Sequence, residues 1–165
     1  MRRKAQEKDE NIELLKDYLG QYLRAKRRER RLKRRLQEFR AEMGTAKAIQ
    51  YSDMPKAPSG NLDGPVMNEV FRVMEIEARI AEQKDKVAKD LLNIMDIFDY
   101  LDTNSDERNA LELHYIDGFK WERVAEEIPC SRSQVFNLQE AGLKKLLEFK
   151  RVREILKKYE AEKTA

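Results

Sequence analysis

Two long heptad runs on either side of a proline- and glycine-rich stretch constrain most strongly what this chain of 165 residues can fold into. The first run lies within residues 7–47, contains no proline, and repeats apolar positions in alternating steps of four and three. Residues 44–65 then hold three of the four prolines and three of the six glycines, a density that interrupts a continuous helix. The second run begins near Pro65, a favoured first-turn residue, and reaches about Leu101. The pattern predicts an antiparallel coiled-coil hairpin over residues 1–101, with a loop at 44–65.

Charged residues within the two seams indicate how the predicted helices pair. If Leu15 lies against Phe98, then Glu29 of the first seam faces Lys84 of the second. Such a charge pair adds little stability but can set the register, and we take it as a hypothesis. The seam expected in the second helix is Val66, Val70, Val73, Glu77, Ile80, Lys84, Val87, Leu91, Ile94, Phe98 and Leu101.

Residues 102–165 predict a series of shorter helices. Thr103 or Ser105 can cap the first, and Asp117-Gly118 marks the turn that follows it. A helix over 120–128 must stop at Pro129, and Ser131 can cap a longer one that begins near Arg132 and extends toward Tyr159. Two helices at such a corner are typical of a helix-turn-helix, in which the second helix enters the DNA major groove. The fold class is therefore all-α, with residues 102–165 as a DNA-binding domain that has an extended C-terminal helix.

The apolar positions of the corner match the helix-turn-helix pattern and leave one face of its second helix polar. With Val135 and Leu138 inward, a recognition helix over about 132–148 presents Arg132, Ser133, Phe136 and Asn137 as base-contacting candidates. Arg and Asn side chains can bind guanine and adenine in a bidentate manner. Three alternatives stay open: Phe136 half-buried against the hairpin, Arg132 on phosphate only, and the lysines near 144 as a solvated helix end. The candidates for phosphate contacts are Lys120, Arg123, Lys144 and Lys145.

The central part of this region resembles region 4 of bacterial housekeeping-type sigma factors. The matching segments are LELHY at 111–115, Gly118, ERVA at 122–125, SR at 131–132 and GLKKL at 142–146. With the SDMP element at 52–55, the whole chain resembles small prophage regulators of the autolysin-regulator and RinA-like type. The resemblance implies recognition of a promoter −35-type element and contact with host RNA polymerase. It implies a transcriptional regulator of phage or prophage genes that acts on double-stranded DNA.

Charge is segregated along the chain. Residues 1–50 hold 16 Lys and Arg against 8 Asp and Glu, whereas residues 51–105 hold 6 against 11. The stretch RAKRRERRLKRR at 24–35 favours a nonspecific DNA arm that binds through counterion release. The alternative is a solvated face that the acidic second helix partly neutralises through Glu75, Glu77, Glu82 and Asp85. The arm candidates are Arg27, Arg30, Arg31 and Arg34.

No catalytic constellation is recognisable, so we expect a protein that is not an enzyme and that needs no metal or cofactor. The chain has one histidine, His114, which we expect at the surface, and one cysteine, Cys130, which we expect to pack in the corner. A single cysteine and the lack of a long apolar run favour a cytoplasmic protein away from membranes. Two arrangements of the tail at 149–159 stay open: it packs on its own hairpin, or it pairs with a second copy in a homodimer. The rival function is a DNA-packaging adaptor similar to a small terminase subunit, with a helical oligomerisation region.

Overall fold

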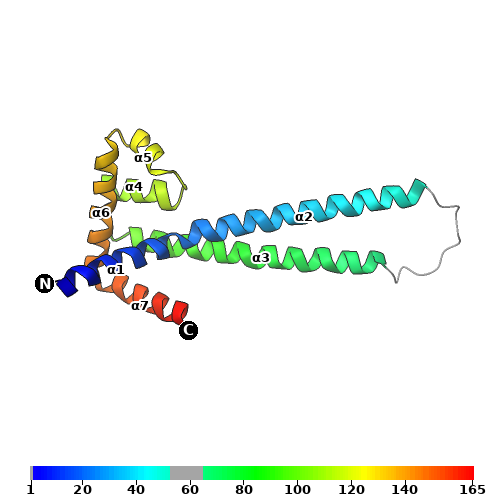
Figure 1. Cartoon of the computed structure of the whole chain (residues 1–165), viewed down its shortest axis with the longest axis horizontal. Coiled ribbons are helices and arrows are strands. Elements are labelled where there is room, and N and C mark those ends of the chain that lie inside the picture. The colour runs from blue at the N-terminus through cyan, green and yellow to red at the C-terminus, as the bar shows by residue number, and fades with distance from the viewer. Residues whose placement is uncertain (1, 53–64) are drawn as a thin grey trace. The chain divides into compact units, whose positions relative to one another are not determined.

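The computed structural model describes residues 2–52 and 65–165, and within these ranges the regular structure is entirely helical, so the protein is all-α there (Figure 1). The helices vary from seven to 34 residues in length. In chain order they are α1 (Arg2–Leu19), α2 (Gln21–Ser52), α3 (Pro65–Phe98), α4 (Asp106–Tyr115), α5 (Trp121–Glu127), α6 (Arg132–Glu148) and α7 (Lys150–Thr164).

The chain divides into two compact units. The first comprises residues 1–24 together with 88–165, and the second comprises residues 25–87. The second unit is therefore made of most of α2 and of the N-terminal two thirds of α3. The domain boundary expected between residues 101 and 102 stays a prediction.

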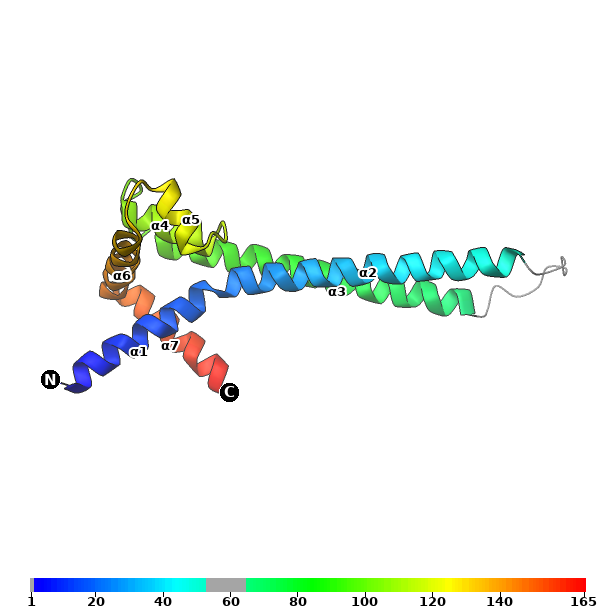
Figure 2. The same ribbon diagram turned by 45° about the horizontal axis from the view of Figure 1, so that its top comes forward.

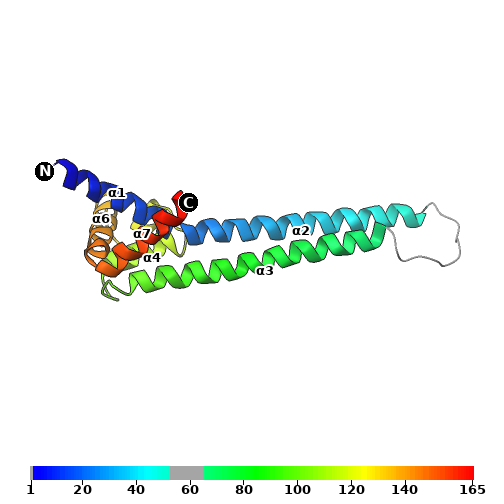
Figure 3. The same cartoon turned by 90° about the horizontal axis from the view of Figure 1, so that it is seen from below.

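In the second unit, α2 and α3 run antiparallel and side by side (Figures 1 and 3). The Gln83 side-chain amide donates a hydrogen bond to the Ala25 carbonyl oxygen over 3.0 Å, and further along the pair Arg40 forms an ion pair with Glu77. The buried side chains here are few: Ala25, Leu36, Ile80 and Gln83. The pair is therefore held by a thin apolar seam.

The seam of α3 differs from the prediction at Val70, Glu77 and Lys84, which are exposed, whereas the expected positions from Val87 to Leu101 are partly or fully buried. Gln83 is buried in place of Lys84, and half-buried Ile76 replaces Glu77, which is exposed. Glu29 forms its ion pair with Lys33 of its own helix, and Lys84 is exposed. The physical reason is that a shift of one residue keeps both charges of α3 in water, where they avoid a desolvation penalty. The amide of Gln83 is satisfied by a backbone carbonyl instead.

In the first unit, α1, α4, α6 and α7 enclose the larger core. Helix α7 packs on α1 (Figure 2), with the rings of Tyr18 and Tyr159 edge-to-face at 5.3 Å. The Tyr159 hydroxyl and the Lys163 ammonium both donate hydrogen bonds to Asp17, at 2.7 and 2.9 Å, and these bonds lower the pKa of Asp17. Burial, and then the Asp17 carboxylate, raise the pKa of Tyr159 to about 12. The tail thus packs on α1 within this unit.

Three helix boundaries differ from the prediction. The long first helix is interrupted at Gly20, and α2 continues to Ser52, so residues 44–52 are helical and not loop. The rest of the predicted loop, with most of the SDMP element, lies outside the described residues. The expected continuous helix from Arg132 to Tyr159 is broken at Phe149, whose backbone is extended at φ −79° and ψ 124°. There the Arg153 guanidinium donates to the carbonyl oxygens of Leu147 and Glu148, which lost their helical partners.

Candidate nucleic-acid interface

Helices α4, α5 and α6 form one packed group around a small apolar core. Ala110 of α4, Val124 of α5, Ile128 after it and Val135 of α6 are buried together. Cys130 and Leu138 pack on this cluster and are partly buried. One side of α6 is therefore committed to the interior, as the apolar pattern of the corner predicts.

The turns between these helices follow from single residues. The Ser105 hydroxyl accepts the Arg108 amide at the start of α4, and Gly118 takes a positive φ of 76° in the turn before α5. Such a φ is costly for residues with a Cβ atom. At α6, Ser131 and Gln134 form a capping box, in which each side chain bonds the other residue's backbone amide. The S-x-x-Q spacing was a readable signal for Gln134, although only Ser131 was predicted as a cap.

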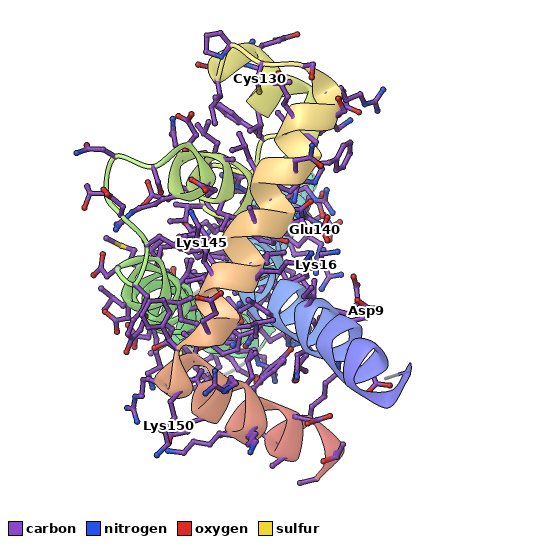
Figure 4. All side chains as sticks on the ribbon, turned by 90° about the vertical axis from the view of Figure 1, so that its left-hand side faces the viewer. Asp9, Lys16, Cys130, Glu140, Lys145 and Lys150 are labelled. Carbon is purple, nitrogen blue, oxygen red and sulfur yellow. The ribbon has the colours of Figure 1, made fainter. Side chains whose placement is uncertain are left out.

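The four base-contacting candidates lie on the exposed side of the first turns of α6. The Arg132 side chain is 68 % exposed and Phe136 is 45 % exposed, and Ser133 and Asn137 are also exposed. The Phe136 ring lies 6.2 Å from that of Trp121 in α5. Phe136 is thus neither buried nor isolated. Figure 4 shows α6 descending from the corner at Cys130, with its upper turns free of neighbouring helices on the viewer's side.

Carboxylates accompany most of the cationic candidates. Arg132 pairs with Glu122 of α5, and Arg123 pairs with Glu126 and Glu127 of its own helix. Residues 120–145 hold five Lys and Arg against four Asp and Glu, so the group has little net charge. These pairs are exposed, and exposed ion pairs are worth about 0–1 kcal/mol. A phosphate can therefore replace the carboxylate at small cost.

The two lysines of α6 lie in different surroundings. Lys144 pairs with Glu140 at 2.6 Å, and this bond lowers the pKa of Glu140. Lys145 extends to Glu107 of α4 at 2.6 Å, and Glu107 is only 19 % exposed. In Figure 4 Lys145 and Glu140 lie on opposite sides of α6, and Lys16 of α1 lies beside Glu140. Lys145 thus ties α4 to α6, whereas Lys144 stays at the surface.

His114 is half-buried and not a surface side chain as expected. Its ring stacks on Trp121 at 3.9 Å, and its Nδ1 lies 2.7 Å from the Phe119 carbonyl oxygen. Because a carbonyl only accepts, Nδ1 carries the hydrogen and donates it. Burial lowers the pKa of His114, against the opposing effect of the hydrogen bond to Phe119. Trp121 is partly buried, and its stack with His114 holds α4 against α5.

All but the first residue of the basic stretch of α2 belongs to the second unit, and its arginines are exposed. Arg34 lies 3.6 Å from Glu38. Among the described residues, Arg27, Arg30 and Arg31 form no ion pair with the acidic residues of α3 or with another carboxylate. Glu75 pairs instead with Arg79 of its own helix, and Glu77 pairs with Arg40. Three of the four arm candidates are therefore free of ion pairs among the described residues, and Arg34 lies beside Glu38.

Comparison of the chain with protein-family models, curated proteins and solved structures finds no match. The likeness to sigma region 4 and to prophage regulators stays a prediction. Over the part of the chain that the structure describes, no helix has the length and apolar character to cross a membrane. In the same part, no three His, Cys, Asp or Glu side chains gather where they could hold a metal ion.

Two carboxylates that were not among the predicted site residues lie at the candidate interface. Glu122 forms the ion pair with Arg132, and Glu140 lies between Lys144 and Lys16. The i,i+4 spacing of Glu140 and Lys144 was a readable signal, whereas the pair of Glu122 with Arg132 joins two helices and has no local signal. Lys120 is the one phosphate candidate without an ion pair among the described residues.

Proposed function

We propose that the chain is a sequence-specific double-stranded DNA-binding transcriptional regulator, with α5 and α6 as its helix-turn-helix. The observation that carries this proposal is the row of exposed side chains on the first turns of α6, opposite buried Val135. A helix held at one side by a core and polar on the other suits entry into a major groove, which is wide enough for an α-helix.

The chemistry of the row supports reading of base edges. Arg132 can donate two hydrogen bonds to the O6 and N7 atoms of guanine, and Asn137 can pair with the N6 and N7 atoms of adenine. The Phe136 ring, held near Trp121, can contact a thymine methyl group. Glu122 orients the Arg132 guanidinium before DNA binds, so less freedom is lost on binding.

Affinity for the backbone would come mainly from α2. The group of α4, α5 and α6 is close to neutral, whereas the basic stretch of α2 holds nine Lys and Arg and one Glu within residues 24–35. Cations that neutralise phosphates release counterions and give affinity that falls steeply with salt. We propose Arg27, Arg30, Arg31 and Arg34 as this nonspecific arm.

The likeness to sigma region 4 extends the proposal to host RNA polymerase. A regulator of phage or prophage genes in the cytoplasm would use α6 to choose a promoter and would recruit the host enzyme to it. Run-off transcription with host polymerase, on a template that carries the selected site, tests this part directly.

The decisive experiment is selection of bound duplexes from random DNA, followed by binding titrations with variants. Arg132→Ala and Asn137→Ala should each lower the ratio of specific to nonspecific affinity by roughly tenfold, since a bidentate contact is worth about 1–3 kcal/mol. Lys158→Ala is the matched control, because Lys158 is an exposed cation of α7 outside the candidate interface. It should keep the site preference. If both alanine variants select the same site as the parent protein, α6 does not read DNA.

A further inference from the structure

Helix α3 carries a second apolar face besides the one that packs on α2. Phe71 is 60 % exposed, Met74 is 57 % exposed and Met67 is 45 % exposed. With exposed Ala78 and Ala81 they follow one another in steps of four, three, four and three. That spacing is the heptad pattern of a coiled-coil seam. Large side chains left in water at this spacing mark an interaction surface.

The second face lies on the far side of α3 from α2. At 100° per residue, Met74 and Ile76 project about 200° apart around the helix. Ile76, Ile80 and Gln83 form the side toward α2, where Ile80 and Gln83 are buried. Helix α2 therefore cannot cover the exposed stripe, which we call the outer stripe: Met67, Phe71, Met74, Ala78 and Ala81.

We propose that a second copy of this chain docks on the outer stripe, with its own α3 antiparallel to the first. In this register Met67 packs against Ala78 of the second copy, and Phe71 packs against Met74 of the second copy. The two-fold symmetry repeats each contact, as a dimer interface of this kind requires. Each layer sets a large side chain against a smaller one or against a flexible methionine, which fills the seam without overpacking.

Charges beside the stripe select the antiparallel orientation. A parallel pair would set Glu77 of one copy beside Glu82 of the other, and like charges there are unfavourable. The antiparallel pair instead brings Glu77 next to Val70 and brings Glu75 next to Asn68. A register shifted further along α3 would bury Asp85 in the seam without a partner, which is costly.

The size of the stripe indicates a dimer of modest strength. The three large side chains of the stripe and flanking Val70, which is 43 % exposed, offer on the order of 100 Å² each, judged from the area that aromatic residues bury. Both copies together would bury roughly 1,000 Å² once flanking residues are included, which is at the lower limit for specific interfaces. The dimer should therefore form and dissociate within an accessible concentration range.

Mass measurement over a concentration series, by analytical ultracentrifugation without DNA, tests the pairing. The parent protein should pass from monomer to dimer, and Phe71→Ser with Met74→Ser should shift that midpoint at least tenfold higher. Leu92→Ser is the matched control: Leu92 is as exposed as Phe71 and lies on the same helix, but outside the proposed overlap. It should leave the midpoint unchanged. A parent protein that stays monomeric, or one that forms rings of many copies, overturns the proposal.

Disulfide trapping tests the register in a Cys130→Ser background. Met67→Cys and Ala78→Cys, carried on differently tagged chains, should form mixed disulfides in preference to disulfides within either species. Such a bond requires Cα atoms about 4.4–6.8 Å apart. Disulfides mainly between identical variants would indicate a parallel pair and contradict the antiparallel one. Because no step uses DNA, failure here leaves the test of α6 unaffected.

Discussion

At the scale of single residues, His114 couples proton binding to folding. Burial lowers its pKa below the ordinary value of 6.5, so the unfolded chain binds a proton more readily than the folded one. Its contribution to stability is complete above about pH 6.5 and is lost as pH falls through the folded pKa. The free energy of unfolding should therefore decline between pH 7.5 and 5.5, as measured by urea titration.

The only tryptophan provides a local readout of the same event. Trp121 stacks on the His114 ring, so protonation of the imidazole should change its fluorescence across the same pH interval. His114→Gln keeps a donor for the Phe119 carbonyl but cannot titrate. In this variant, the free energy of unfolding and the Trp121 fluorescence should both depend less on pH, because the chain has no other histidine. An equal slope in this variant would assign the pH dependence to the carboxylates.

Gly142 marks the closest approach of α4 and α6. A Cβ atom there would lie 2.8 Å from Leu111 Cδ1 and 3.3 Å from Glu107 Cβ. Leu111 is fully buried and has little room to move. Gly142→Ala should therefore cost about 1–3 kcal/mol by overpacking, more than the gain of about 1 kcal/mol in helix propensity.

Gly44 offers the matched control for this substitution. It lies in α2, and a Cβ atom added there would meet nothing within 4 Å. Gly44→Ala should be neutral or slightly stabilising, by at most about 1 kcal/mol. Thermal and chemical unfolding followed by circular dichroism compares the two variants. Equal stability changes in the two variants would contradict a close contact between α4 and α6.

At the scale of helices, the starts were more predictable than the ends. Pro65, Ser105 and Ser131 are local signals, and each begins a helix where the sequence predicts one. The break at Phe149 has no such signal, because neither glycine nor proline is near it. It is set by tertiary contacts, in which Arg153 caps α6 and Tyr159 reaches Asp17. Sequence periodicity reports local helix preference and contains no information on these tertiary contacts.

The candidate site was predictable in outline for the same reason. Val135 inward and Arg132 outward follow from helical spacing, and the structure places both as expected. The partners of the cations were not predictable, since Glu107 and Lys145 are 38 residues apart in sequence. The seam of α3 was misassigned because Val73, Ile80 and Val87 satisfy two heptad frames equally. Only the cost of burying Lys84 or Glu77 distinguishes those frames.

The exposed arginines of α2 should determine how strongly DNA binding depends on salt. Replacing Arg27, Arg30, Arg31 and Arg34 with Gln should reduce the slope of log affinity against log salt by up to about 4, one unit per lost phosphate contact. The matched control replaces four exposed cations of α7 and should change the slope much less. An unchanged slope in the α2 variant would exclude the arm. The control residues are Lys150, Arg151, Lys157 and Lys158.

At the scale of the whole molecule, the two compact units differ in how much apolar surface they bury. The unit of residues 25–87 has a thin seam, whereas the other unit holds most of the fully buried side chains, among them Phe98, Leu111 and Leu143. Local stability follows the density of buried apolar contacts. Hydrogen exchange measured by mass spectrometry should therefore be fastest in residues 25–44 and 67–87 of the described chain, and slowest in α4 and α6.

Hydrogen exchange measured at several protein concentrations distinguishes the effect of core size from the effect of self-association. Protection of residues 67–78 should increase with concentration if a second copy covers the outer stripe, because binding stabilises the state that it selects. Residues of α4 and α6 lie outside the proposed overlap and should exchange at a constant rate throughout. The Phe71→Ser, Met74→Ser variant should lose the concentration dependence but keep the difference between the two units. A rise in protection that spreads evenly over both units would instead indicate association through another surface.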